Sequence, residues 1–147
     1  MTIKISIYCI ISVILVSCNS ATYHFDSPDK KQSITIITRG DVRYIINGHS
    51  YFVPDSNFVK VDLSGIDRET GDETVGCWDQ GKFRWVIAMN GVRVLENKTD
   101  TSLYRFESNF PLDKLGIPTV GDFRKKNCFS IAMEYRNLSA VQGALLQ

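Results

Sequence analysis

The stretch GCWDQGKFRWVIAMNGVRVL, residues 76–95, decides the fold because it holds the clearest strand pattern and the clearest turn signal of the chain. Large apolar side chains occupy every second position of residues 83–89, which is the period of a strand with one face on a core. Asn90-Gly91 follows directly. An Asn-Gly pair between alternating runs favours a hairpin, because a type I′ turn needs positive φ at both central residues. The sequence therefore predicts a hairpin with Met89 opposite Val92.

The same alternation predicts further short strands on both sides of this stretch. They cover residues 33–38, 42–46, 51–53, 58–63, 103–107 and 128–135. About seven short strands with turn signals between them favour an all-β fold, an antiparallel sandwich or a small barrel. Near the C-terminus, Leu138, Val141 and Leu145 have helical spacing behind Ser139, which can cap a helix. A short C-terminal helix is therefore expected.

Residues 1–17 have the features of a signal peptide. A single lysine, Lys4, precedes an apolar run that ends at Val16 and is too short to cross a bilayer comfortably. The run ends in Leu15-Val16-Ser17-Cys18, which resembles the lipobox of bacterial lipoproteins. The resemblance implies that Cys18 is lipidated and becomes the mature N-terminus, and that the membrane is a partner through this anchor. The alternative is ordinary secretion, with cleavage after Ser20.

The remainder divides into a spacer and one domain. Residues 18–32, the lipidated cysteine and a polar segment without an apolar period, are predicted to be a flexible tether. As a coil the tether would reach on the order of 20 Å. Residues 33–147 are predicted to form a single β domain, since a chain of 147 residues needs no second one. The formal net charge of +1 argues against a nucleic-acid binder, which normally shows a strongly basic face.

Cys77 and Cys128 are the two cysteines downstream of Cys18, and an exported domain lives in an oxidising compartment. We therefore expect a disulfide between them. A zinc site is not expected, because no second cysteine or histidine lies at ligand spacing from either one. No metal and no cofactor is predicted.

Trp78 and the charged residues around the predicted disulfide form the candidate binding site. Acids precede or follow the tryptophan, and basic residues precede Cys128 in the sequence. The candidate residues are Trp78, Asp79, Asp72, Glu73, Arg124 and Lys125. A disulfide would bring both charge signs and an indole to one edge of the fold, a mixture that suits a protein interface.

Catalysis is not expected, because the chain offers no acid, base and nucleophile with a fixed mutual geometry. A triad would have to rest on His49, and the adjacent Ser50 would point to the opposite face of an extended strand. The leading hypothesis is a surface-tethered, non-enzymatic β domain that binds another macromolecule, as inhibitor or immunity-type lipoproteins do. The alternatives are a carbohydrate or cell-wall binding module, with Trp78, Tyr51 or Tyr104 stacking on sugars, and a secreted eukaryotic or viral glycoprotein.

Overall fold

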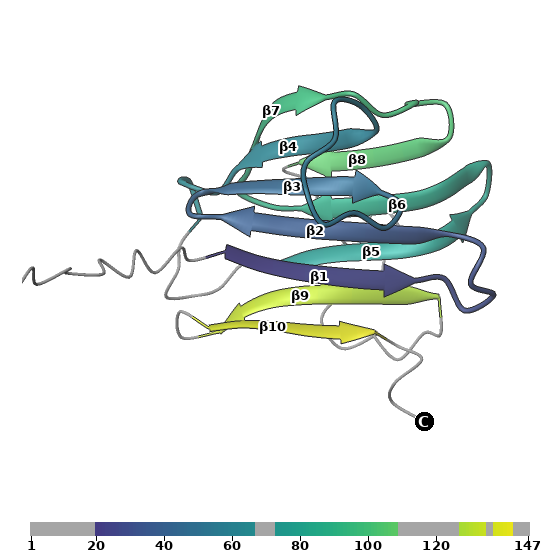
Figure 1. The fold of residues 1–147 in the computed structure, drawn as a ribbon, viewed down its shortest axis with the longest axis horizontal. Coiled ribbons are helices and arrows are strands. Elements are labelled where there is room, and N and C mark those ends of the chain that lie inside the picture. The colour runs from purple at the N-terminus through teal and green to yellow at the C-terminus, as the bar shows by residue number, and fades with distance from the viewer. Residues whose placement is uncertain (1–19, 67–72, 109–126, 135–136, 143–147) are drawn as a thin grey trace, which may run out of the picture.

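The computed structural model describes residues 20–66, 73–108, 127–134 and 137–142, which fold as two β-sheets packed face to face (Figure 1). These residues form ten strands and no helix, so the predicted all-β sandwich is confirmed. No segment among them is a helix with the length and hydrophobicity that a membrane span requires.

Sheet A is antiparallel throughout. Its order is β1 (Ser20–Asp26), β2 (Ser33–Arg39), β3 (Val42–Asn47), β4 (Phe58–Asp62) and β7 (Arg93–Asn97). Sheet B is mixed, with the order β10 (Asn137–Gln142), β9 (Cys128–Glu134), β5 (Glu73–Gln80), β6 (Phe83–Met89) and β8 (Tyr104–Ser108). In sheet B only β6 and β8 are parallel.

The main core lies between the inner faces of the two sheets. Alternation along each strand sends every second apolar side chain inward, as expected for a sandwich. Trp78 on β5 lies directly opposite Trp85 on β6, and both side chains are completely buried. The other large buried members include Phe25, Ile34, Ile36, Ile45, Ile87, Met89, Phe129 and Ile131.

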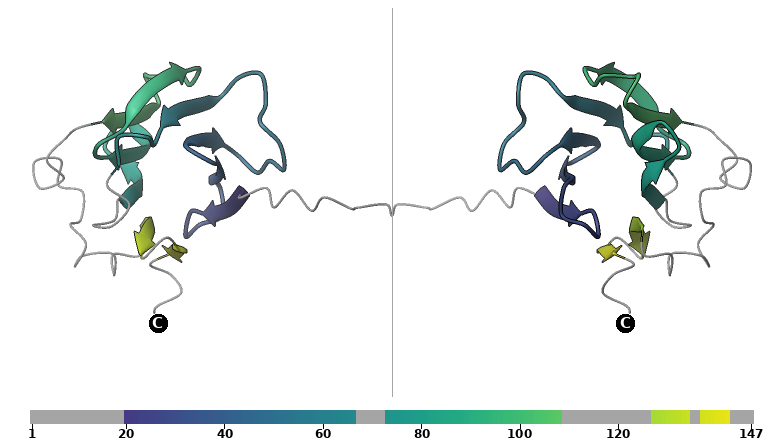
Figure 2. Two further views of the ribbon diagram at one scale, coloured as in Figure 1. Left: turned by 90° about the vertical axis from the view of Figure 1, so that its left-hand side faces the viewer. Right: turned by 90° about the vertical axis from the view of Figure 1, so that its right-hand side faces the viewer.

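A second apolar layer covers the outer face of sheet A. Ile37, Ile46 and Phe58 point away from the main core, yet they are buried together and pack against Val53. Val53 belongs to the connection between β3 and β4, residues 48–57, which we name the strap. In the side views this connection lies on the outer side of sheet A, away from sheet B (Figure 2).

The predicted hairpin at Asn90-Gly91 is wrong. Gly91 does adopt a positive φ of 74°, but the strands on its two sides belong to different sheets. β6 pairs with β5 in sheet B, whereas β7 pairs with β4 in sheet A. Asn90-Gly91 is therefore a crossing between sheets, and the true hairpin of β6 turns at Gly81, where φ is 64°.

The predicted flexible tether is also wrong for residues 20–26. This segment is β1, which pairs with the whole of β2 from Ser20 opposite Arg39 to Asp26 opposite Ser33. Tyr23 and Phe25 face the core, and the side chain of Phe25 is buried. Burial of these aromatic rings provides the apolar contact that a free coil would lack.

The expected C-terminal helix is replaced by a strand over residues 137–142. β10 pairs antiparallel with β9, Asn137 lying opposite Glu134 and Gln142 opposite Phe129. Backbone pairing with a neighbouring strand overrides the weak helical spacing of the apolar residues, as tertiary context commonly does. Leu145 lies outside the described residues. β1, β5 and β10 are strands that the sequence did not predict. The predicted strand at residues 51–53 is wrong, because these residues belong to the strap between β3 and β4.

Candidate functional site

The predicted disulfide is confirmed. Cys77 and Cys128 lie opposite each other on the adjacent strands β5 and β9, with their Cα atoms 4.1 Å apart and a sequence separation of 51. Both side chains are buried on the outer face of sheet B, together with Val75, Val86 and Ala88. A disulfide in a domain of this size indicates an oxidising, exported environment.

The predicted contact role of Trp78 is wrong, because its indole is completely buried and lies 5.6 Å from the ring of Phe129. Neighbouring residues on a strand point to opposite faces, so Trp78 enters the core while Cys77 faces outward. Asp79 is exposed and accepts a hydrogen bond of 2.7 Å from the side-chain amide of Gln32. Asp72, Arg124, Lys125 and Cys18 lie outside the described residues, as does the side chain of Glu73. The candidate site predicted from sequence therefore loses its aromatic anchor.

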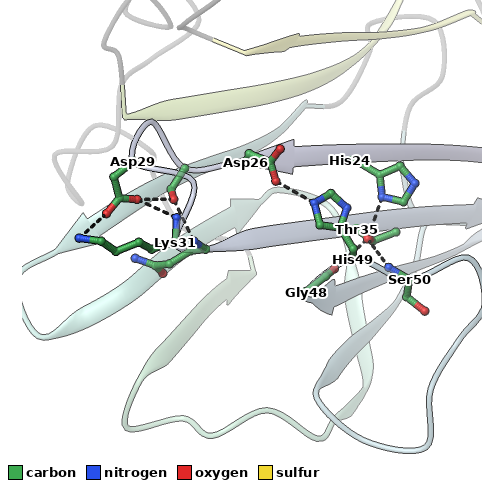
Figure 3. A network of polar contacts seen from close by, with 10 residues as sticks. His24, Asp26, Asp29, Lys31, Thr35, Gly48, His49 and Ser50 are labelled. Atoms are coloured by element: carbon green, nitrogen blue, oxygen red, sulfur yellow. Dashed lines mark hydrogen bonds and ion pairs between the residues drawn. The ribbon is translucent and has the colours of Figure 1, made fainter.

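A different surface brings polar side chains together, where the strap crosses the outer face of sheet A (Figure 3). Its centre is the hydroxyl of Thr35 on β2, a completely buried residue. This hydroxyl donates to the carbonyl of Gly48 (2.8 Å) and accepts from the backbone N–H of Ser50 (3.0 Å). One β2 side chain thus fixes the first turn of the strap.

His24 on β1 joins the same hydroxyl, with Nδ1 3.0 Å from Oγ1 of Thr35. Because the single proton of Thr35 goes to the carbonyl of Gly48, Thr35 accepts here and Nδ1 of His24 carries the proton. The imidazole of His24 lies 5.3 Å from that of His49 and meets the ring of Tyr51 edge-on at 5.7 Å. The rings form a short row along the edge of the strap.

His49 in turn contacts Asp26 at the end of β1, with Nε2 2.8 Å from Oδ1 (Figure 3). Both side chains are about half exposed, at 56% and 48%. Within the described residues, no hydroxyl or thiol is hydrogen-bonded to His49, and no group of three histidine, cysteine or acidic side chains is arranged to hold a metal. The pair is suited to holding the strap against β1 and to surface recognition.

The far end of the strap is also fixed. The backbone N–H of Asn47 donates to the carbonyl of Asn57 across the base of the strap (2.9 Å). The backbone N–H of Asn57 donates to the carbonyl of Lys98 (3.2 Å). Asn57 adopts a positive φ of 61°, which asparagine tolerates better than most residues. Between the two ends, Val53 packs into the outer apolar layer.

The tip of the strap is an adjacent pair of aromatic residues in solvent. Tyr51 is 88% exposed and Phe52 is 69% exposed, more than any other large apolar side chain described. The hydroxyl of Ser50 bonds to both the carbonyl and the N–H of Phe52, so the tip has internal backbone contacts of its own. Burying one aromatic side chain contributes about 1.5–3 kcal/mol of favourable free energy. A partner that covers Tyr51 and Phe52 would gain this contribution from each ring.

A shallow depression lies elsewhere, between the residues after β4 and those before β7. It is lined by Asp62, Ser64, Gly65, Gly91, Val92 and Arg93, with a volume of about 410 Å³. Arg93 donates a hydrogen bond of 2.8 Å to the carboxylate of Asp62. The pKa of Asp62 is lowered mainly by the hydrogen bond that its carboxylate accepts from the backbone N–H of Ser64. The charged side chains of this depression thus satisfy each other, and the strap tip is the stronger candidate.

No match was found for this chain among protein-family models, curated proteins or solved structures.

Proposed function

We propose that this chain is an exported, non-enzymatic β domain that binds another macromolecule, as inhibitor or immunity-type lipoproteins do, and that it binds through the strap tip. The observation that carries the proposal is the exposed pair Tyr51 and Phe52 on a loop fixed at both ends. Aromatic side chains are frequent energetic anchors of interfaces. A loop already held in one conformation loses little entropy when it binds.

A partner captured at the tip would test this proposal. A photoreactive amino acid would replace Phe52 in one preparation of the full chain and Leu95 in another. Leu95 is the matched control, because it is an exposed apolar residue (43%) on β7, at the opposite edge of sheet A from β1. We expect a cross-linked partner from position 52 and none from position 95.

The Tyr51→Ser/Phe52→Ser variant provides the second arm of the test. We expect it to weaken binding of the cross-linked partner by at least about tenfold, since truncation of an interface anchor costs about 2 kcal/mol or more. Its unfolding midpoint should stay near that of the wild type, because surface substitutions normally change stability by less than about 0.5 kcal/mol. Equal cross-linking from both positions, or unchanged affinity of the variant, would exclude the tip as the binding surface.

A carbohydrate partner is the second candidate. The exposed ring of Tyr51 stands beside His24, on the strand that also carries the half-exposed carboxylate of Asp26, and sugars are bound by ring stacking together with polar side chains. Trp78 and Tyr104 are buried and offer no stacking surface, so the support rests on Tyr51 alone. Retention of the wild type, but not of Tyr51→Ser, on insoluble peptidoglycan or chitin would favour this candidate over a protein partner.

The lipid anchor on Cys18 is part of the proposal, and it is supported by the lipobox-like Leu15-Val16-Ser17-Cys18. We propose that the anchor holds the domain at a bacterial membrane, facing the periplasm or the cell surface. Growth of the expressing cells with radioactive palmitate should label the wild type and not Cys18→Ala. An unlabelled wild type would instead support ordinary secretion.

A further inference from the structure

Two acidic side chains are linked to the aromatic tip, one along the chain and one through side-chain contacts of the strap. Residues 48–57 contain a single formal charge, the exposed Asp55, which follows the tip by three residues. Asp26 lies on β1, where its Oδ1 is 2.8 Å from Nε2 of His49 in the strap. The strap thus carries one acid of its own and contacts a second acid on β1.

The contacts among the rings place Asp26 and the tip on one continuous surface. Tyr51 meets His24, His24 lies beside His49, and His49 contacts Asp26. The two ring separations are 5.7 and 5.3 Å. A single partner that covers Tyr51 would therefore also reach the carboxylate of Asp26.

Two lysines of the neighbouring segments, Lys31 and Lys98, contact other acids. Lys31 contacts Asp29 at 3.2 Å in the turn between β1 and β2, on the far side of Asp26 from the strap (Figure 3). Lys98, beside the base of the strap, contacts Glu96 at 3.1 Å. The charges of these two lysines are compensated locally.

Lys60 lies on β4, with Nζ 5.7 Å from the centre of the Tyr44 ring, whereas Tyr51 meets His24 on β1, the strand that also carries Asp26. β1 and β4 are separated by two strands of sheet A, so the acid and not this lysine lies on the strand that Tyr51 contacts.

We propose that the strap tip binds a polypeptide segment in which apolar side chains are flanked by lysine or arginine. The inference rests on the proposed function and adds the chemistry of the partner. Apolar side chains of the segment cover Tyr51 and Phe52, and its basic groups face Asp26 and Asp55. Complementary charges of this kind set orientation and association rate more than total affinity.

Two labelled synthetic peptides of equal length test this chemistry by fluorescence anisotropy. One is an amphipathic peptide of leucine and lysine, and the other has glutamate in place of every lysine. We expect the full chain to bind the leucine-lysine peptide at least about tenfold more tightly than the leucine-glutamate peptide, with the contrast largest at about 0.01 M salt and nearly lost at about 1 M salt. Equal binding of the two peptides would overturn the proposal.

Two variants then measure separately how much the aromatic pair and the two acids contribute to peptide binding. Tyr51→Ser/Phe52→Ser should weaken binding of the leucine-lysine peptide by about tenfold or more at any salt concentration. Asp26→Asn/Asp55→Asn, which keeps an acceptor for His49, should weaken it by about threefold at low salt only. The control is Asp41→Asn, an exposed acid in the turn between β2 and β3, which should bind like the wild type.

The outcomes separate this inference from the proposed function. If both variants bind the leucine-lysine peptide like the wild type, the acidic tip is not the site and the inference fails. If the cross-linking from position 52 captures a partner while the wild type binds neither peptide, the binding function stands and the basic, apolar partner chemistry is rejected.

Discussion

The ring of Phe129 on β9 covers Gly76, which lies directly opposite it on β5. A Cβ atom added at Gly76 would come within 2.2 Å of Cζ of Phe129. Glycine in a strand interior often marks a close approach of this kind, and here it makes room for a core ring that also packs against Trp78.

We expect Gly76→Ala to destabilise the domain by about 1–3 kcal/mol, because the new methyl group must displace a completely buried ring. Urea unfolding of the variant measures this. The cost should be much smaller in the Phe129→Leu background, where the ring is absent. An equal cost in both backgrounds would show that the loss comes from the β5 backbone and not from the ring.

The disulfide provides a second prediction. Cys77→Ala/Cys128→Ala should lower the free energy of unfolding by about 4 kcal/mol in the chain-entropy model for a separation of 51 residues. Reductant should lower the unfolding midpoint of the wild type and leave that of the double variant unchanged. If reductant left the unfolding midpoint of the wild type unchanged, a stabilising disulfide would be contradicted.

Removal of the Thr35 hydroxyl should loosen the strap. In Thr35→Val the carbonyl of Gly48 and the N–H of Ser50 lose their buried partner, at a cost of about 1–3 kcal/mol. The amide of Ser50 should then exchange its hydrogen markedly faster. The matched control is Thr22→Val, an exposed threonine on β1, where neither stability nor exchange should change. Unchanged exchange at Ser50 in Thr35→Val would mean that the strap is held by other contacts.

The turn between β1 and β2 predicts a pH effect. The hydroxyl of Ser27 and then the backbone N–H of Lys31 donate to Asp29 and lower its pKa from 3.8 to about 2. Because the folded-state pKa is the lower one, the contribution of Asp29 to stability is complete above about pH 4 and is lost as the pH falls through about 2.

Unfolding midpoints of the wild type and of Asp29→Asn, measured from about pH 6 down to about pH 2, check the direction of this pH effect. The wild type should be the more stable protein at the upper end, and the difference should shrink as the carboxyl group is protonated. A difference that grows toward acid pH would contradict the assignment of this carboxylate to the turn.

Much of the fold could be predicted because it follows from local alternation. The run from Phe83 to Met89 and the β-branched segment from Ser33 show a period of two, and both are strands. The pairing of Cys77 with Cys128 followed from counting cysteines in an exported domain. Strand partners could not be obtained in this way. A turn signal at Asn90-Gly91 states how the backbone bends, whereas the sheet that receives the next strand depends on contacts distant in sequence.

The candidate site was harder to predict, for a related reason. The sequence suggests Trp78 as a binding residue, but the alternation through Gly76 and Trp78 places both on the inner face. The strap site joins β1, β2 and a loop, and no local pattern reports that His24 meets Tyr51. One signal was present: Tyr51 and Phe52 are adjacent between two turn signals, and adjacent residues of a strand cannot both face one core.

The start of β1 at Ser20 has a consequence for any lipid anchor. A chain attached to a membrane at Cys18 would have one residue, Asn19, before a strand that is paired along its whole length with β2. The reach of two residues is about 7 Å, in place of the about 20 Å of a coil. Asp26 lies six residues along the strand, about 20 Å farther at 3.3 Å per residue. The distance of the strap from the membrane would then be set by the length of the paired strand β1 and not by the length of a flexible tether.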